Sequence, residues 1–462
     1  MVASPPPFDA VVTPAVDKIL IAQKPVGAAV GVVKDGKLVY IKTYGLRNIA
    51  KNEPVDDNTR FEIGSVTKQF TAAAVLQLQE AGKLSIDDKL AKYFPTFPHA
   101  DEVTLRQMLN QVSGLEDYLH HVPPEHLSTG GGLSAVAELV NVPLHFTPGT
   151  RWEYSNTNYY VLGKVVEKVS GQSWEAYVRE HIFAAAGMTR SAFVDDEPSL
   201  DDYAVGYWKG FDSKLPLQPA PLIHNAWAGG AGEIVSTVAD MAAWDTALTS
   251  GKIVRAVDYT LMSTPPTLPG GSPDTYGMGL GADPLDGHKR IWHNGGSLGS
   301  FTMNATYPDD RLDIIVFENS TSGTNPSVVE AAVLESIFPD AAMAAHAAAP
   351  GEDLAMRPLI LHFLDEAMSG SLQSSELTPS FAKIATRETQ KQIAQQFAQL
   401  GKPTGVIFKG KDENGNTTIY HYRVEFPTTT VKVDIGFDNK THLVAGLGFS
   451  ADILRHPVDR RR

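Results

Sequence analysis

The sequence predicts an α+β fold, in which an antiparallel sheet is flanked by helices and a small α+β unit follows. Asp35-Gly36 stands between two apolar segments and is a strong signal for a hairpin of neighbouring antiparallel strands. Strand-like segments return only near residue 290, after a long and mostly helical region. The strands from both ends of this first unit are therefore expected to join in one sheet backed by helices.

The elements are expected in the following order along the first unit. Residues 8–23 have the apolar spacing of an amphipathic helix. Strands at 27–33 and 38–44 form the hairpin, and a long apolar helix begins at Ser65 and ends near Gly82. Helices and loops continue to about residue 189, and the sheet is completed by strands at 290–293, 300–307 and 312–318.

The charge balance predicts a second unit. The first 350 residues hold 25 Lys+Arg and 40 Asp+Glu, a net charge of −15, whereas residues 351–462 hold 14 and 13, a net charge of +1. An alanine-rich stretch at 341–353 lies at this change, and we interpret it as a linker between domains 1–340 and 354–462. The second domain should contain helices at 354–368 and 387–400, then strands at 405–409, 417–426, 429–437 and 443–450. This order resembles a small nuclear-transport-factor-2-like cone.

Composition excludes several classes of partner and chemistry. The net charge of −14 argues against nucleic acid. The chain has no cysteine, which excludes disulfides and thiolate metal sites, and no run of 18 apolar residues, so no membrane span is expected. The first seven residues lack the basic and apolar regions of a signal peptide. The protein is expected to be periplasmic or secreted with its signal peptide removed, the alternative being cytoplasmic.

Ser65 and Lys68 form the first candidate catalytic motif, Ser-x-x-Lys. Residues at i and i+3 lie on one face of a helix, so an amine would be held beside a hydroxyl that is otherwise a poor nucleophile. Chance supplies such a pair roughly once or twice in a chain of this length. Further elements are therefore needed to support a catalytic role.

Tyr154 and Asn156 supply a second element, Tyr-Ser-Asn. A phenol has a solution pKa of about 10, and adjacent cations could lower it until it works as a base. Asn156 could orient Lys68 and contact a substrate amide. The alternative for such a motif by itself is a turn with a buried aromatic side chain.

His293, Gly295 and Gly296 lie in the third element, His-Asn-Gly-Gly, at the end of a predicted strand. Small residues there would let a substrate approach the backbone closely. The Gly296 N–H and the Ser65 N–H could then form a two-donor oxyanion hole, which is worth several kcal/mol in a transition state. The alternative is a glycine-rich turn with a surface histidine.

In this order the three elements resemble those of the serine β-lactamase-related superfamily, which includes class C β-lactamases, DD-peptidases and family VIII carboxylesterases. Flanking segments strengthen the resemblance: Leu109 to Leu115, Gly187-Met188-Thr189, Ala228-Gly229-Gly230 with Ser236-Thr237, Tyr276 to Gly279 and Glu318-Asn319. It spans about residues 10 to 340. It implies a β-lactamase/transpeptidase-like fold, Ser65, Lys68 and Tyr154 as catalytic residues, and Asn156, His293, Gly295 and Gly296 as substrate-binding residues.

Two positions depart from the family pattern. His293 replaces the lysine of the usual Lys-Thr-Gly, so a permanent cation becomes a group that is largely neutral at pH 7. This weakens the expectation of efficient β-lactamase action. Gln111 stands where relatives often have histidine.

The resemblance predicts a serine hydrolase that forms an acyl-enzyme on Ser65, without a metal or an organic cofactor. The expected partner is a small ester, amide or β-lactam substrate, and assembly into a homo-oligomer is left open. We favour carboxylesterase-type hydrolysis with weak β-lactamase activity. The alternatives are a D-amino-acid-directed peptidase, such as a DD-carboxypeptidase or D-aminopeptidase, and a non-catalytic sensor of penicillins or peptidoglycan.

Ser297 is a rival nucleophile, because Gly295 to Gly299 formally match Gly-x-Ser-x-Gly. That motif needs a strand before it and a helix after it, and residues 301–307 alternate like a strand instead. We therefore interpret it as a decoy. His120, His121 and His126 lack the spacing of metal ligands with a flanking acid and are expected to be loop residues.

Overall fold

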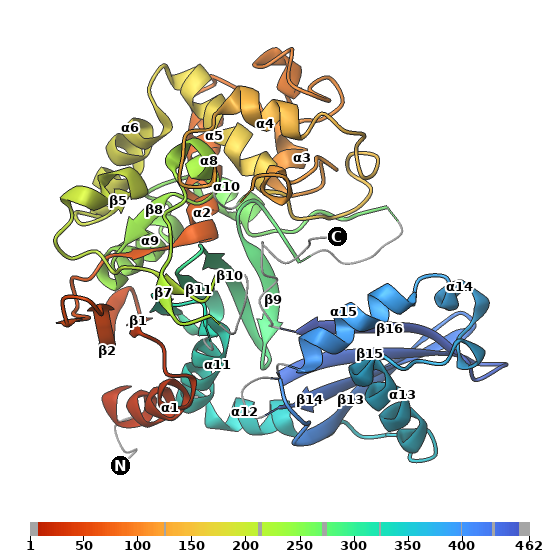
Figure 1. Ribbon diagram of the computed structural model, residues 1–462. Coiled ribbons are helices and arrows are strands. Elements are labelled where there is room, and N and C mark those ends of the chain that lie inside the picture. Colours follow the sequence, from red (N-terminus) through yellow and green to blue (C-terminus); the bar gives the residue numbers. More distant parts are fainter. Residues whose placement is uncertain are drawn as a thin grey trace. The chain divides into compact units, whose positions relative to one another are not determined.

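The computed structural model describes residues 8–123, 126–210, 215–269, 275–322, 325–398, 400–426 and 430–451. The chain divides into two compact units, the first ending at Ile337 and the second beginning at Phe338 (Figure 1). Part of the expected linker is helical, since helix α12 covers Pro339–His346. Alanine has the highest intrinsic helix propensity, which explains this helix. Residues 1–7 and 452–462 of the two predicted domains lie outside the described residues.

The first unit is built around a seven-stranded antiparallel sheet of order β3-β2-β1-β12-β11-β10-β9. Its strands are β1 (Gly27–Lys34), β2 (Lys37–Asn48), β3 (Glu53–Pro54), β9 (Gly281–Leu285), β10 (His288–Gly296), β11 (Phe301–Tyr307) and β12 (Leu312–Glu318). Strand β1 pairs with β12, and Val30 lies opposite Val316. The prediction that the two ends of the unit share one sheet is confirmed. Edge strand β9 was not predicted, because Asp283-Pro284 interrupts its apolar pattern.

The hairpin between β1 and β2 has the turn that the sequence predicts. Asp35 and Gly36 both adopt positive φ, 53° and 73°, and Lys34 pairs with Lys37 across them. Positive φ at both central residues is the type I′ geometry, whose twist matches that of the flanking strands. The two segments therefore enter the sheet in the expected register.

Helices surround this sheet. Helix α1 (Phe8–Gln23) packs against α11 (Pro326–Ile337). Helix α9 (Val238–Thr249) packs on β1. The contact is close, since a Cβ at Gly31 would lie 2.2 Å from Val238 Cγ1. The other helices are α2 (Thr67–Glu80), α3 (Leu105–Leu109), α4 (Leu133–Leu139), α5 (Asn156–Ser170), α6 (Trp174–Val178), α7 (Ala184–Ala186), α8 (Asn225–Ala228) and α10 (Ala256–Met262). The short strands β4 (Phe61–Glu62), β8 (Ile234–Ser236) and β5 (Ala192–Phe193) form a small sheet, and β6 (Tyr207–Trp208) pairs with β7 (Gln218–Pro219).

Helix α2 lies in the interior of the first unit. All of its side chains from Thr67 to Leu76 are buried. A 3₁₀ turn, Gly64–Val66, leads into it, and Gly64 adopts a φ of +51°. A Cβ at Gly64 would lie 2.7 Å from the backbone N and O of Gly296, so glycine lets β10 approach the start of the helix. Ser65 is thereby placed between a strand edge and a helix N-terminus.

The second unit is a separate α+β domain with its own core. Its antiparallel sheet has the order β13 (Gly405–Asn414), β14 (Thr417–Glu425), β15 (Thr430–Asp438) and β16 (Val444–Ala451). Helices α13 (Arg357–Ser369), α14 (Pro379–Ala382) and α15 (Arg387–Ala398) accompany it, and Phe363, Phe408 and Val433 are buried in the core. Both predicted helices and all four predicted strands are present, although Thr429 lies outside the described residues. The resemblance to a nuclear-transport-factor-2-like cone stays a prediction.

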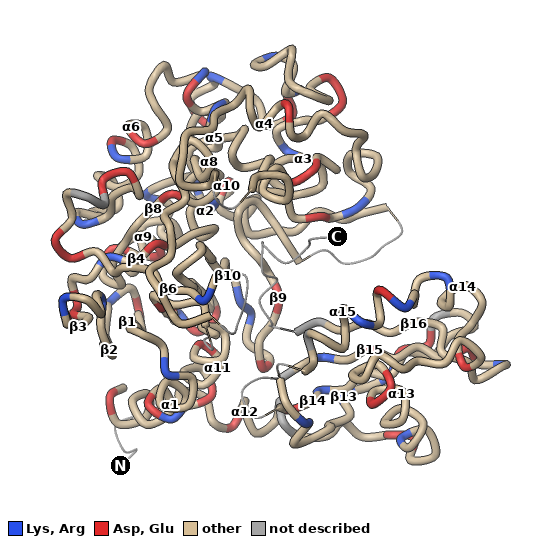
Figure 2. The backbone as a smooth tube through the Cα atoms, viewed as in Figure 1, with Lys and Arg blue, Asp and Glu red and all other residues tan. Residues whose placement is uncertain are grey.

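Charged residues are distributed along both units, with acidic and basic positions interspersed (Figure 2). In the part of the chain that the structure describes, every helix is too short or too polar to cross a bilayer.

Candidate active site

Ser65 lies at the centre of a compact group of polar side chains. The Nζ of Lys68 lies 2.9 Å from Ser65 Oγ, and the hydroxyl of Tyr154 donates to the same oxygen over 2.8 Å. Lys68 comes from the first turn of α2, and Tyr154 precedes α5, 89 residues further along the chain than Ser65. The structure therefore brings the first two predicted motifs together at one atom.

Lys68 is fully buried, and this burial changes its proton affinity. Removing an ammonium from water disfavours its charged form. Desolvation lowers the pKa of Lys68 from 10.5 to about 7, although the charge of Asp117 opposes this shift. Near neutral pH, Lys68 can therefore exist as a neutral amine and accept a proton.

Asn156 and Ala231 orient the Lys68 amine. Lys68 Nζ donates to Asn156 Oδ1 over 2.8 Å and to the Ala231 carbonyl over 2.7 Å. Asn156 Nδ2 donates to Asp117 Oδ2 over 2.9 Å, which leaves its oxygen facing Lys68. Asn156 Oδ1 and the Ala231 carbonyl can only accept hydrogen bonds, so a neutral Lys68 amine must donate its two N–H groups to them. Its lone pair then faces the Ser65 hydroxyl.

Tyr154 differs from the expectation that nearby cations would lower its pKa. Tyr154 is partly buried, and desolvation raises the pKa of its phenol well above 10, while the hydrogen bond with Ser65 acts in the opposite direction. Lys68 Nζ lies 4.9 Å from the ring centroid of Tyr154. Lys68 has a depressed pKa itself, and its amine does not offset the rise in the Tyr154 pKa that burial causes. Tyr154 is therefore a neutral hydrogen-bond donor to Ser65.

Backbone N–H groups near Ser65 have the arrangement of an oxyanion hole. Ser297 N donates to Ser300 O over 2.9 Å, and Gly296 pairs with Phe301. Hydrogen-bonded and non-hydrogen-bonded pairs alternate in an antiparallel ladder, so the Gly296 N–H points away from β11, on the side of β10 that β9 covers only as far as Trp292. Ser65 lies in the 3₁₀ turn that leads into α2, where N–H groups lack intrahelical acceptors. Both predicted donors can therefore serve as an oxyanion hole, since the Gly296 backbone closely approaches Gly64, next to Ser65.

His293 lies on β10 and is held as a neutral ring. Its Nε2 lies 2.9 Å from the hydroxyl of Tyr276. Burial, reinforced by the charge of Lys68, lowers the pKa of His293 to about 3, although a hydrogen bond to the Asn294 carbonyl opposes the shift. The position that carries a cation in the usual family motif therefore carries an uncharged group here. Gly295 approaches Ile63 so closely that a Cβ would lie 1.9 Å from its carbonyl oxygen.

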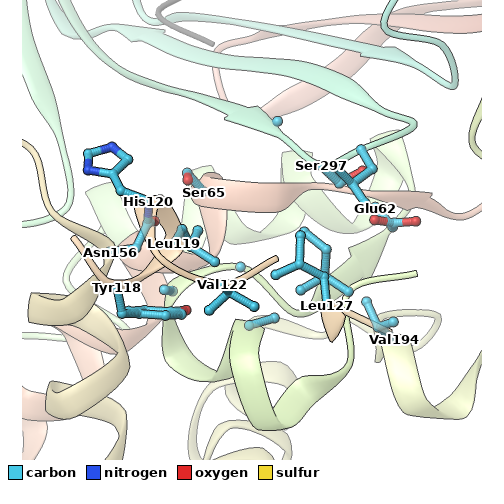
Figure 3. A pocket seen from close by; sticks show the side chains of 16 residues that line it. Glu62, Ser65, Tyr118, Leu119, His120, Val122, Leu127, Asn156, Val194 and Ser297 are labelled. Atoms are coloured by element: carbon cyan, nitrogen blue, oxygen red, sulfur yellow. The ribbon is translucent and has the colours of Figure 1, made fainter. Parts of the chain in front are cut away.

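A cavity of about 960 Å³, including its open mouth, adjoins Ser65 (Figure 3). Ser65, Asn156, Gly296 and His120 contribute to its wall. Most of the remaining wall is apolar, from Tyr118, Leu119, Val122, Leu127, Val194, Ile223, Ala228 and Leu298. The cavity can accept an apolar group next to the nucleophile.

Residues 8–336 match the family model described as Beta-lactamase. The chain belongs to the beta-lactamase family. It is similar to penicillin-binding protein 4* of Bacillus subtilis, with 30% identity over 63% of this chain and 67% of that protein. It is also similar to a D-aminopeptidase of Cereibacter sphaeroides, with 30% identity over 63% of this chain and only 56% of that protein. A solved D-stereospecific amidohydrolase from Streptomyces sp. has 25% identity and a TM-score of 0.61, covering 71% of this chain and 98% of its own.

Membership of this beta-lactamase family confirms the predicted fold and the predicted resemblance. The protein is a serine hydrolase with the β-lactamase/transpeptidase-like antiparallel sheet and a separate C-terminal domain. Ser297 precedes strand β11 rather than a helix, so it lacks the setting of a nucleophile elbow.

Several residues of the site had no clear sequence signal. Asp117, which orients Asn156, and the Ala231 carbonyl, which binds Lys68, carry no motif. Gln111 was noted only as a departure, yet its Oε1 accepts from Ser155 N over 3.0 Å and from Asn158 Nδ2 over 2.6 Å. These contacts fix the segment that begins α5, and they link positions more than 35 residues apart.

Proposed function

We propose that the protein hydrolyses amide or ester bonds of small D-amino-acid derivatives through an acyl-enzyme on Ser65. The observation that carries this proposal is the placement of Ser65 Oγ between Lys68 Nζ, at 2.9 Å, and the Tyr154 hydroxyl, at 2.8 Å. A nucleophile in contact with its base and with a second proton carrier is the arrangement that covalent catalysis requires.

Acylation begins with proton transfer from Ser65 to neutral Lys68. Ser65 Oγ then forms a bond to the substrate carbonyl carbon, and the negative charge that develops on the carbonyl oxygen is stabilised by the N–H groups of Ser65 and Gly296. When the C–N or C–O bond breaks, the leaving group takes a proton from Tyr154, and the Lys68 ammonium then returns a proton to Tyr154. Lys68 is again neutral when the acyl-enzyme has formed.

Deacylation repeats these steps with water as the nucleophile. Neutral Lys68 takes the proton of the attacking water, and Ser65 Oγ is the leaving group and recovers that proton. The carboxylic acid product then dissociates.

The neutral state of His293 supports amide and ester substrates that need no free carboxylate beside the scissile bond. β-Lactams and C-terminal D-Ala-D-Ala peptides carry such a carboxylate, and a buried neutral imidazole offers it no full charge. The similarity to D-aminopeptidases and to a D-stereospecific amidohydrolase supports D-amino-acid derivatives in particular. This moves the proposal from the carboxylesterase favoured by the sequence toward its D-amino-acid-directed alternative.

Carboxylesterase action remains the second candidate, and the apolar cavity favours it. Leu119, Val122 and Leu127 line the same cavity as Ser65, and this surface suits an acyl chain as well as an amino-acid side chain. Both reactions use the same acyl-enzyme, so they differ only in the acyl group and leaving group accepted.

The test compares purified wild type with Ser65→Ala and Ser297→Ala. Substrates are D- and L-phenylalanine p-nitroanilides, p-nitrophenyl esters, nitrocefin and a D-Ala-D-Ala peptide, and a fluorophosphonate probe reports labelling. We expect turnover of D-anilides above L-anilides, and loss of labelling and turnover in Ser65→Ala only. Loss in Ser297→Ala instead would contradict the proposal.

The same panel separates an enzyme from a sensor. Stable acylation by penicillin without turnover of any ester or anilide would indicate a non-catalytic binder. A location outside the cytoplasm, assembly into a homo-oligomer and the absence of a nucleic-acid partner stay predictions.

A further inference from the structure

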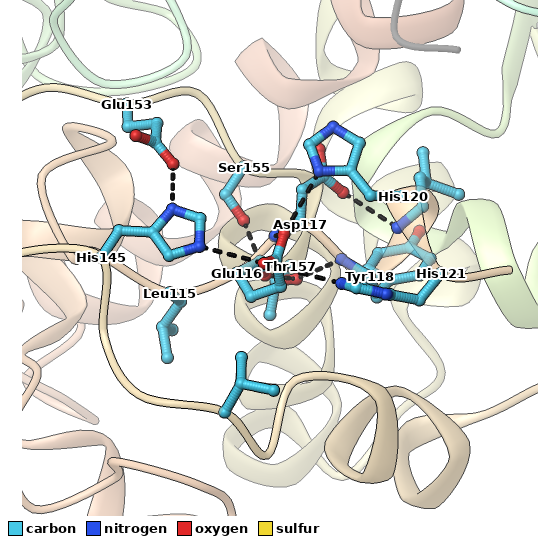
Figure 4. Close-up of polar contacts among 12 residues, drawn as sticks. Leu115, Glu116, Asp117, Tyr118, His120, His121, His145, Glu153, Ser155 and Thr157 are labelled. Carbon is cyan, nitrogen blue, oxygen red and sulfur yellow. Dashed lines mark hydrogen bonds and ion pairs between the residues drawn. The ribbon is translucent and has the colours of Figure 1, made fainter. Parts of the chain in front are cut away.

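Acidic and histidine side chains cluster in the segments that precede Asp117 and Tyr154 and in neighbouring loops (Figure 4). Glu116 is at the centre of this cluster, and its side chain is 13% exposed. His120 Nδ1 lies 3.2 Å from the Glu116 carboxylate, His121 Nε2 3.5 Å, and His145 Nε2 3.0 Å. We call these residues, together with Glu153, the Glu116 cluster.

His145 connects the two carboxylates of the cluster. Its Nε2 contacts Glu116 and its Nδ1 contacts Glu153 (Figure 4). A carboxylate only accepts hydrogen bonds, and a neutral imidazole has a single N–H group. Both contacts can be hydrogen bonds at the same time only if His145 is an imidazolium. With both carboxylates ionised, the geometry therefore favours a protonated histidine between them.

The cluster joins the two segments that position the groups around Ser65. Glu116 directly precedes Asp117, whose carboxylate orients Asn156. Glu153 directly precedes Tyr154, whose hydroxyl contacts Ser65 Oγ. A change in the distance between Glu116 and Glu153 would thus move the two sides of the site relative to each other.

Backbone contacts of Glu116 add to this connection. Its carbonyl accepts from Ser155 Oγ over 3.2 Å and from Thr157 Oγ1 over 2.6 Å. Its own carboxylate accepts from the Asp117 N–H over 2.9 Å. Glu116 therefore contacts the Tyr-Ser-Asn segment from its main chain and holds Asp117 from its side chain.

We propose that Glu116 and protonated His145 are positioning residues for the reaction at Ser65, and that loss of the His145 proton loosens the site. This inference rests on the proposed function of Ser65. Neither residue contacts Ser65, and both act through Asp117 and Tyr154. The expected signature is a fall in kcat at alkaline pH.

The charges that face His145 determine the direction of this pH dependence. Glu116 and Glu153 lie on either side of the ring, and His120 and His121 lie on the far side of Glu116. Burial disfavours the imidazolium, but hydrogen bonds to Glu153 and Glu116 outweigh it and raise the pKa of His145 above 6.5. The pKa of Glu116 is lowered to about 2, chiefly by a hydrogen bond from His120. Burial opposes this shift, and His145 adds to it. Glu116 thus stays ionised, and the bridge is lost as pH rises through the pKa of His145.

The experiment measures kcat and KM against pH for wild type, His145→Asn and Glu116→Gln. We expect kcat to fall about 10- to 100-fold in both variants, as for other small displacements of reacting groups, with KM changed far less. The alkaline limb set by His145 should disappear in His145→Asn. His99→Asn is the matched control, because His99 also bridges two segments, contacting Glu102 and the Val142 carbonyl, each at 2.7 Å. It should leave kcat and the pH profile unchanged.

A second readout keeps this inference separate from the proposed function. Histidine NMR on Ser65→Ala protein should give His145 a pKa above 6.5, and Glu116→Gln in that background should lower it. Wild-type values of kcat in both variants, with unchanged pH profiles, would overturn the inference, as would a His145 pKa at or below 6.5. Absence of Ser65 labelling in wild type would overturn only the proposed function, since the NMR titration does not depend on turnover.

Discussion

The Oδ1 atom of Asn156 lies 2.8 Å from Lys68 Nζ, and this contact gives the Lys68 amine its orientation. Asn156 can face Lys68 with its oxygen because its nitrogen donates to the Asp117 carboxylate. The amine lone pair is consequently directed at Ser65 when Lys68 is neutral. Proton transfer from Ser65 then needs no rearrangement of side chains.

The first prediction concerns pH. Desolvation lowers the pKa of Lys68 to about 7, and only the neutral amine accepts the Ser65 proton. We expect kcat/KM for a p-nitrophenyl ester to rise with pH through a midpoint near 7 and then to level off until other groups titrate. A midpoint near 10, the usual range of an exposed lysine, would contradict this role. Lys68→Ala should lose at least about 100-fold in kcat.

The second prediction uses Asp117→Asn. The charge of Asp117 raises the pKa of Lys68 and partly offsets desolvation. Asparagine can still accept from Asn156 Nδ2 but carries no charge. The acidic limb of the kcat/KM profile should therefore move to lower pH. An unchanged limb would mean that the Asp117 charge does not act on Lys68, and movement to higher pH would contradict the predicted direction.

The third prediction is that Tyr154→Phe lowers kcat by about 10²- to 10⁴-fold, the usual contribution of a proton carrier. The variant keeps the aromatic ring and removes the hydroxyl that contacts Ser65 Oγ. Tyr160→Phe is the control, since the buried Tyr160 hydroxyl has no hydrogen-bond partner among the described residues. Steady-state rates on one ester should separate the two variants. Equal losses would indicate a general packing effect.

The fourth prediction concerns Gly64→Ala. A Cβ there would lie 2.7 Å from the backbone of Gly296, at a φ of +51°. Displacing β10 would move the Gly296 N–H from the oxyanion, so we expect a loss of at least about 100-fold in kcat. Gly82 has a similar φ of +67° but open space around its Cβ position, so Gly82→Ala should cost only about 1–2 kcal/mol of stability. Wild-type kcat in Gly64→Ala would contradict the placement of the oxyanion hole.

The fifth prediction concerns stability. Glu330 is fully buried, lies 3.2 Å from Arg290 Nη1 and accepts from the Tyr307 hydroxyl over 2.6 Å. Glu330→Gln leaves the Arg290 charge partly uncompensated and should cost about 3 kcal/mol or more, visible as a lower Tm in calorimetry. Asp87→Asn breaks an exposed pair with Arg106 and should cost less than about 1 kcal/mol. Equal Tm values for the two variants would refute this difference.

Local patterns predicted most of the elements, because period and turn chemistry depend on neighbouring residues. The hairpin at Asp35-Gly36, the opening helix and the strands of both units have the expected positions. Edge strand β9 was missed, since pairing with β10 rather than its own pattern stabilises it. The helical start of the alanine-rich stretch was interpreted as a linker, because composition does not distinguish a helix from a spacer.

The sequence by itself determined that Ser65, Lys68, Tyr154, Asn156, His293, Gly295 and Gly296 are candidates for one serine-hydrolase site. The tertiary structure decided how they are charged and oriented. Burial lowers the pKa of Lys68 to about 7 and raises the pKa of Tyr154. From the sequence alone, the pKa of Tyr154 was expected to be lowered. Asp117, Ala231 and the Glu116 cluster entered the site only through contacts between distant segments. Proton affinity depends on desolvation and on such long-range neighbours, and neither is encoded in local spacing.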